Sequence, residues 1–210
     1  EITGPLSEQA AFAISGGFNN RDGYFEDKGR DSLSNERDRW NVRGDLLVEP
    51  HEDVSLRFIA DFEKIDEICC GANNLVDGPT GNAIRGLGGR VISNAPYAFE
   101  EALNFDSTTV VENAGFSAQA DIDFTGFTLT SISAYRTSEV SQDQDSDFTS
   151  ADLIQKNLTE TSISTITQEI RLTSTGDNRI DWLVGAFFFN EDVGINTDFQ
   201  YGTDFRGYVN

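Results

Sequence analysis

The sequence predicts an all-β protein, a segment of an antiparallel, up-and-down transmembrane β-barrel. Seven segments alternate between apolar and polar residues with the period of two that half-buried strands show. Their connections alternate between tight turns and long polar loops. In a membrane barrel, all turns lie in one compartment and all loops lie in the other, so short and long connections must alternate along the chain. No such constraint acts on the connections of a soluble β-sandwich.

The expected elements follow one another closely along the chain. The strands cover approximately residues 8–19, 38–49, 54–67, 113–123, 127–140, 161–174 and 181–192. Tight turns are expected at 4–6, 50–53, 123–126 and 175–179, and long extracellular loops at approximately 20–37, 68–112, 142–160 and 194–210. Consecutive strands are therefore expected to pair with one another, each antiparallel to the next.

The hairpin formed by 38–49 and 54–67 can be tested for register. Placing Val48 opposite Val54 pairs aliphatic residues, covers a glycine with an aromatic ring and opposes two unlike charges. The resulting pairs are Leu46–Leu56, Gly44–Phe58, Trp40–Phe62 and Asp45–Arg57. A slip by two residues, which pairs Arg43 with Asp61, is the main alternative.

The remaining strands are read in the same way, with less regular faces toward the end. In the first strand Phe12, Ile14 and Phe18 alternate with smaller residues. Strands 127–140 and 181–192 carry large apolar residues on both sides, such as Ile132 against Leu129 in the former. For those two strands the sequence predicts the strand but not its facing.

The charged rows decide which side of the sheet meets lipid. An arginine near the middle of a membrane would cost roughly 2–4 kcal/mol, so the charged rows are expected to face the lumen. The predicted lumen-facing residues are Arg43, Asp45, Arg57, Asp61, Asp121, Glu169 and Arg171. The predicted lipid-facing or girdle residues are Trp40, Val54, Leu56, Phe58, Phe62 and Trp182.

Seven strands cannot close a bacterial barrel, which needs an even number and at least eight. Two open edges in lipid would leave on the order of ten unpaired backbone groups, each costing several kcal/mol. We therefore expect the chain to be an excerpt, open at both edges, of a wider barrel.

Several short motifs occur in a recognisable order and spacing. They lie at 4–7 (GPLS), 20–24 (NRDGY), 35–44 (NERDRWNVRG), 46–50 (LLVEP), 129–136 (LTSISAYR), 168–174 (QEIRLTS) and 181–189 (DWLVGAFFF). No single motif is diagnostic, but together they span nearly the whole chain outside the interior of loop 72–110. In these motifs the chain resembles the barrel region of a TonB-dependent outer-membrane receptor.

This resemblance implies a 22-stranded barrel in the bacterial outer membrane, with an N-terminal plug. Such receptors import scarce nutrients, such as ferric siderophores, cobalamin or oligosaccharides, with energy delivered through TonB. The implied partners are outer-membrane lipid, the remaining strands and plug of the same protein, TonB and the nutrient ligand. The plug and the TonB box are absent from these residues, and no ligand-binding residue is carried over from the family.

Composition and motifs exclude several other classes. The net charge of −21 argues against nucleic acid, which requires a basic surface. No apolar run approaches the roughly 18 residues of a membrane-spanning helix. Neither a G-x-S-x-G elbow, nor an H-E-x-x-H motif, nor the spacing of a Cys–His dyad occurs. The sequence therefore predicts no enzyme and no cofactor.

Two short motifs can be explained either by a functional role or by a purely structural one. Asp143, Asp145 and Asp147 form the D-x-D-x-D opening of a calcium loop. A calcium loop would also need Gly at its sixth position and Glu at its twelfth, which are Phe148 and Ile154 here, so a hydrated loop tip without metal is favoured. The adjacent cysteines at 69 and 70 either form a small staple or remain free thiols, and the sequence leaves both readings open.

The candidate ligand-recruiting segment is loop 68–112, which is too long to be a simple connection. Its candidate ligand-binding residues are Arg85, Arg90, Tyr97 and Phe99. Two alternative functions are kept. One is a passive outer-membrane porin, and the other is a secreted acidic β-sandwich that acts as an adhesin or carbohydrate-binding module.

Overall fold

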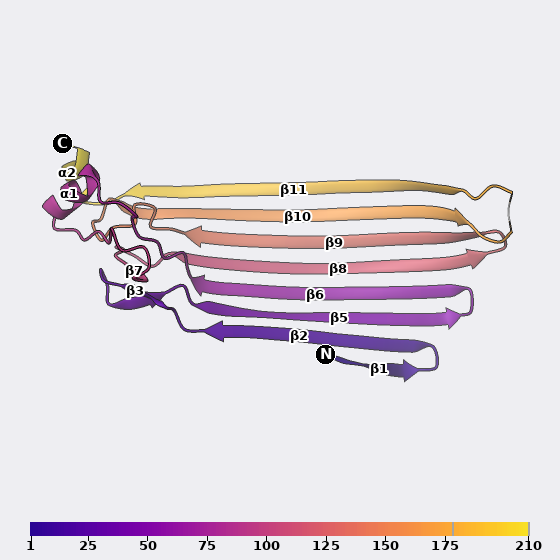
Figure 1. Ribbon diagram of the computed structural model, residues 1–210. Coiled ribbons are helices and arrows are strands. Elements are labelled where there is room, and N and C mark those ends of the chain that lie inside the picture. Colours follow the sequence, from indigo (N-terminus) through magenta and orange to yellow (C-terminus); the bar gives the residue numbers. More distant parts are fainter. Residues whose placement is uncertain (178, 210) are drawn as a thin grey trace.

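A computed structural model describes residues 1–177 and 179–209 and confirms the all-β class. Eight strands form one antiparallel up-and-down sheet in the order β1-β2-β5-β6-β8-β9-β10-β11 (Figure 1). Their bounds are β1 Ile2–Ser7, β2 Ala10–Arg21, β5 Arg37–His51, β6 Val54–Ile68, β8 Thr108–Phe124, β9 Phe127–Asp143, β10 Ile154–Ser174 and β11 Leu183–Tyr201. No helix in the described part of the chain is long and apolar enough to cross a membrane.

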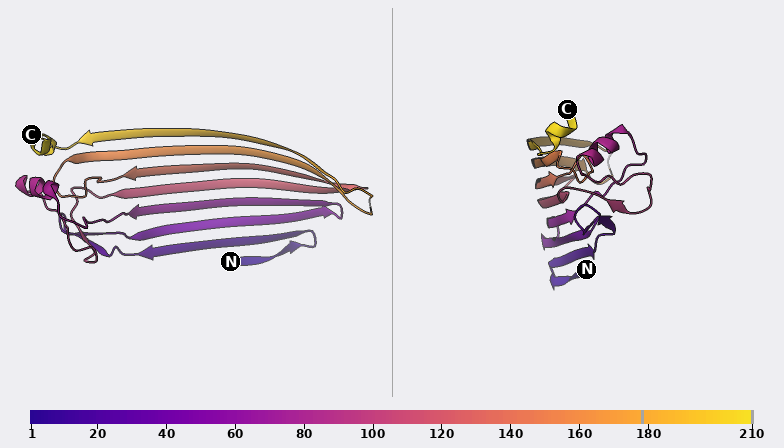
Figure 2. Two further views of the ribbon diagram at one scale, coloured as in Figure 1. Left: turned by 45° about the horizontal axis from the view of Figure 1, so that its top comes forward. Right: turned by 90° about the vertical axis from the view of Figure 1, so that its left-hand side faces the viewer.

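The long loops fold together at one end of the sheet. They contain a second, small sheet made of β3 (Phe25–Asp27), β4 (Ser32–Ser34) and β7 (Glu100–Glu101), together with α1 (Pro79–Gly86) and α2 (Phe205–Val209). We call this assembly, residues 22–36, 69–107, 144–153 and 202–209, the cap. In the end-on view of Figure 2 the cap lies mainly to one side of the large sheet.

Several boundaries predicted from the sequence are wrong. Strand β8 begins at Thr108 rather than at 113, and β10 begins at Ile154 rather than at 161, because both strands extend into the residues expected to form the preceding loop. The turn expected at 4–6 lies inside β1. Residues 2–7 form an eighth strand that pairs with β2, so the sheet has one strand more than expected. The loop predicted from 194 begins only at 202, because β11 continues to Tyr201 and pairs with β10 along its whole length. Acidic and amide residues alternate there with Val193, Ile195 and Phe199. The many polar residues made this segment resemble a loop in the sequence. Residue 178, inside the predicted turn 175–179, lies outside the described residues.

The predicted register of the β5–β6 hairpin is wrong, and the alternative that pairs Arg43 with Asp61 is observed. The strands are joined by two residues, Glu52 and Asp53, rather than by a longer loop. An irregularity between Val48 and His51 supplies the extra residue, and Pro50, which has no N–H for the ladder, lies within it. Two of the predicted contacts are still made, but between residues that lie diagonally across the two strands and not directly opposite each other. Arg57 Nε donates to Asp45 Oδ1 at 3.0 Å, and the rings of Trp40 and Phe62 lie 5.1 Å apart.

A slip by two residues leaves every side chain on its predicted side, because the side-chain period is two. The pairing places all seven residues predicted to face the lumen on one side of the sheet, which we call the charged face. It places Trp40, Val54, Leu56, Phe58 and Phe62 on the opposite, apolar face, and Trp182 directly precedes β11. Which face meets lipid stays a prediction.

The pairing also settles the two strands whose facing was open. Leu129 lies on the apolar face, in line with Ile122 and Val54, whereas Ile132 lies on the charged face. In β11, Phe188 lies on the apolar face, and its neighbours Phe187 and Phe189 lie on the charged face. Phe124 and Phe127 stack at the turn end of the apolar face, with ring centroids 4.9 Å apart.

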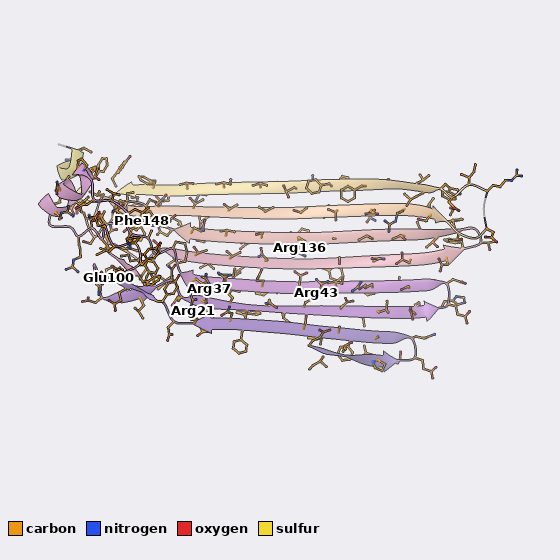
Figure 3. All side chains as sticks on the ribbon, viewed as in Figure 1. Arg21, Arg37, Arg43, Glu100, Arg136 and Phe148 are labelled. Carbon is orange, nitrogen blue, oxygen red and sulfur yellow. A yellow bond between two sulfur atoms is a disulfide. The ribbon has the colours of Figure 1, made fainter. Side chains whose placement is uncertain are left out.

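A four-strand ion ladder crosses the charged face. Arg136 on β9 reaches over β8 to Asp61 on β6, with Nη2 to Oδ2 at 2.8 Å, while Arg43 on β5 approaches the same carboxylate at 3.7 Å (Figure 3). Arg136 can cross because Gly115 lies beneath it, where a Cβ atom would be 2.5 Å from Nη1. The gap at Gly115 thus lets one guanidinium link strands that are not neighbours.

The apolar core of the described residues lies in the cap and not in the sheet. Ile84, Ala151 and Leu153 form a buried cluster, against which Leu87, Val91 and Tyr208 pack. None of the large apolar side chains described in the large sheet is fully buried, and many are exposed, such as Phe116 and Ile166. The sheet therefore presents two broad faces with nothing packed over most of their length.

Candidate functional site

The cap is the part of the chain where side chains from distant segments converge, and buried carboxylates tie these segments together. Asp27 Oδ1 accepts hydrogen bonds from Gly29 N at 2.8 Å and from Leu103 N at 3.1 Å. Glu101, which is fully buried, accepts a short hydrogen bond from Ser34 Oγ and another from Ala72 N at 3.2 Å. Burial raises the pKa of Glu101 above that of an exposed glutamate.

The D-x-D-x-D motif organises the loop between β9 and β10. Asp145 is fully buried, and its carboxylate accepts hydrogen bonds from Asn104 N at 3.1 Å and Asp147 N at 3.3 Å. Asp147 in turn accepts from Thr149 N at 2.9 Å and Ile154 N at 3.2 Å. Among the described residues, no group of three or more acidic, histidine or cysteine side chains is arranged to hold a metal ion. These two carboxylates therefore accept hydrogen bonds from backbone N–H groups of the cap and of Ile154.

The burial of Asp145 gives the cap a pH dependence. Burial raises the pKa of Asp145 to about 7, and the negative charge of the nearby Asp147 contributes to this rise. The proton of Asp145 is bound more tightly in the folded cap than in an unfolded loop, so this stabilisation is complete below about pH 4 and is lost as the pH rises toward 7. The difference between the two pKa values corresponds to on the order of 4 kcal/mol.

We expect the amides of residues 144–153 to be better protected from hydrogen exchange at about pH 5 than at about pH 8, after correction for the intrinsic rate. In the Asp145→Asn variant, whose residue 145 is neutral at both pH values, this difference should be smaller, and what remains reports Asp147, whose pKa is also raised by burial. Equal protection of the unmodified protein at both pH values would contradict the assignment.

The two adjacent cysteines form a disulfide where the longest loop leaves β6. Cys70 has a positive φ of 77°, and Asn35 Oδ1 accepts hydrogen bonds from Cys70 N at 2.9 Å and from Gly71 N at 3.2 Å. The bridge and the Asn35 side chain together fix the direction in which this loop enters the cap. The sequence left the bridge and free thiols equally open.

The structure does not bring the four predicted ligand residues together. Arg85 binds Asp77 at 2.5 Å, in the space left by the missing side chain of Gly81, and Arg90 donates to the carbonyl oxygen of Lys28. Both arginines therefore tie cap segments to each other. Tyr97 is 85% exposed, and Phe99 packs in an aromatic cluster beside β7. Their role in ligand binding stays a prediction.

The aromatic cluster consists of Tyr24, Phe25 and Phe99, whose ring centroids lie 5.3 to 5.7 Å apart in edge-to-face contacts. The guanidinium of Arg21 lies 4.9 Å from the centre of the Tyr24 ring. Figure 3 shows Arg21 and Arg37 at the end of the sheet that carries the cap. Tyr24 and Phe99 remain half exposed, so the cluster presents ring edges at the surface.

A cavity of about 310 Å³ lies beside α1, lined by side chains from three cap segments. These include Asn74 and Thr80 from the longest loop, Asp147 and Leu153 from the β9–β10 loop, and Tyr208 from α2. Sequence reasoning missed these residues because they share no periodicity or motif. The only local signal was Gly78-Pro79, which marks the start of α1.

No family model matches the chain, and no curated protein matches its sequence. A comparison with solved structures finds the ferric yersiniabactin uptake receptor FyuA from Yersinia pestis, with a TM-score of 0.71 and 14% sequence identity. The match covers 95% of this chain and 29% of that chain. At this level of identity the similarity shows the fold: the up-and-down sheet is arranged like part of that receptor.

Proposed function

We propose that this chain is part of the barrel of a TonB-dependent outer-membrane receptor, which imports a scarce nutrient with energy delivered through TonB. One observation carries the proposal: the chain forms an up-and-down sheet with a folded cap at one end, and 95% of the chain aligns with the ferric yersiniabactin uptake receptor. Ferric siderophores are one nutrient class of the family, but the ligand of a neighbour only 14% identical is not carried over.

The physics of the two faces supports a membrane barrel. The charged face carries the Arg43–Asp61–Arg136 ladder, whose burial in lipid would be costly, whereas the apolar face exposes Phe116, Ile166 and Phe188. In the proposed barrel the apolar face contacts outer-membrane lipid, and the charged face meets the lumen and the plug. The edges of β1 and β11 then pair with the remaining strands.

The alternatives receive less support. A secreted β-sandwich would bury the apolar face against a second sheet, and in the described residues the small β3–β4–β7 sheet lies at the cap end and not over that face. A passive porin shares the barrel, but has no need of a plug or of TonB. TonB dependence therefore separates a receptor from a porin.

The full-length protein that contains this chain should fractionate with the outer membrane. A nutrient that supports growth only when this gene is present should cease to do so when tonB is deleted. Uptake that is unchanged without TonB would reject the receptor, and recovery of the protein in a soluble, lipid-free fraction would reject the membrane barrel.

A further inference from the structure

We infer that the cavity beside α1 binds an uncharged, hydroxyl-rich ligand of the carbohydrate type. This inference rests on the proposed function and specifies the class of nutrient that the cap recruits. The cavity of about 310 Å³ lies at the lower end of the roughly 300–1,000 Å³ usual for small-molecule sites.

The polar groups of the cavity that remain open to a ligand are neutral. Among the described residues, no hydrogen-bond partner occurs for the Asn74 amide, the Thr80 hydroxyl or the Tyr208 hydroxyl. The backbone of Asn74 is held by bonds with Ile92 O and Asn94 N, at 3.0 and 3.1 Å. Asn74 is thus fixed in place, and these three side chains can both donate to and accept from ligand hydroxyls.

The charged groups of the cavity are already used. Both carboxylate oxygens of Asp147 accept hydrogen bonds from the loop, and Asp77 binds Arg85. No lysine or arginine belongs to the described lining. An anionic ligand would therefore enter without a cationic side chain to pair with it, which is unfavourable in a partly closed site.

Part of the cavity wall is apolar. Ile84 and Leu153 belong to the buried cluster of the cap, and Val91 packs against them. A sugar ring presents hydroxyl groups at its rim and C–H groups on its faces. Such a ring can place one face on this wall while its hydroxyls meet the neutral polar side chains.

The charge around the cavity disfavours anions. Acidic residues outnumber basic ones in the cap, and the chain carries a net charge of −21. The cap's lysine and two of its arginines are neutralised by acids: Lys28 by Glu26 and Glu100, Arg30 by Asp106, and Arg85 by Asp77. A field of one sign slows the approach of ligands of the same sign, so an anionic ferric complex would be repelled.

The test uses the purified full-length receptor in detergent and isothermal titration calorimetry. The probes are maltotriose, xylotriose and cellotriose as neutral ligands, ferric enterobactin as an anion and ferrioxamine B as a cation. We expect at least one trisaccharide to bind, with an affinity that is unchanged between about 0.05 and 0.5 M salt. Thr80→Val and Tyr208→Phe should each weaken that binding about five- to tenfold, because each removes one hydrogen bond.

Tyr135→Phe is the matched control, because Tyr135 lies on the apolar face of β9 and does not line the cavity; it should leave the affinity unchanged. The inference is overturned if none of the trisaccharides binds, or if a bound trisaccharide is insensitive to Thr80→Val and Tyr208→Phe. Tight binding of either ferric complex in their place would also overturn it. These titrations contain no TonB, so their failure is distinguishable from a failure of TonB-dependent uptake.

Discussion

Replacing Phe58 by Arg should destabilise the full-length barrel by about 2–4 kcal/mol, the cost of an arginine facing lipid near the middle of the membrane. Phe58 lies on the apolar face of β6, opposite Leu46 on β5 and Ala118 on β8. The expected result is a lower denaturant midpoint in lipid bilayers and less protein in the outer membrane. The measurement is the midpoint of urea unfolding, followed by tryptophan fluorescence.

Ile59→Arg is the matched control, because Ile59 is the next residue of the same strand and lies on the charged face. Its cross-strand neighbours are Asp45, which Arg57 already binds, and Ser117, so an arginine there stays in a polar environment beside a carboxylate. The Ile59→Arg protein should therefore assemble nearly as well as the unmodified one. If Phe58→Arg were tolerated and Ile59→Arg destabilising, the two faces would be assigned the wrong way round.

Excising residues 75–92 should abolish ligand binding and leave the barrel intact. Asn74 and Ser93 form an isolated bridge, and Asn94 N donates to Asn74 O at 3.1 Å, so the cut ends already lie together and a three-glycine linker can join them. The excision removes Thr80, Ile84 and Val91 from the cavity. Losing these contacts together should weaken binding more than about a hundredfold.

Barrel assembly after the excision is checked by heat-modifiable migration on gels, and ligand binding by the same titration as for the unmodified receptor. The strand pairs lie outside the excised segment, so the folded band should persist. A wider deletion of 72–110 would be a poorer test, because it also removes Glu101, Ser107 and the first residues of β8. Unchanged affinity after the short excision would show that the cap lobe around α1 takes no part in recognition.

The fold class could be predicted because strand periodicity is a local property. Residues 54–62 show the period of two by themselves, and so do 40–48, whatever their partners are. A pairing error of two residues, as in the β5–β6 hairpin, left the sides of Arg43, Asp61 and Phe58 unchanged. The eighth strand and the end of β11 were missed because their alternation is short or is masked by many polar residues.

The candidate site could not be predicted in the same way. Asn74, Leu153 and Tyr208 come from segments that are far apart in the sequence, and only the folding of the cap brings them around one cavity. Arg85 and Arg90, which suggested ligand contacts by residue type alone, are used in bonds within the cap. Whether a charge is free or already paired is decided by its three-dimensional neighbours.

The sequence by itself determined that the chain forms strands and which side chains share a face, because alternate residues of a strand point to opposite sides whatever pairs with it. The tertiary structure alone decided the register of the first long hairpin, the Cys69–Cys70 bridge and the cavity beside α1. These depend on turn geometry and on contacts between distant segments. Such contacts leave no periodic pattern along the chain.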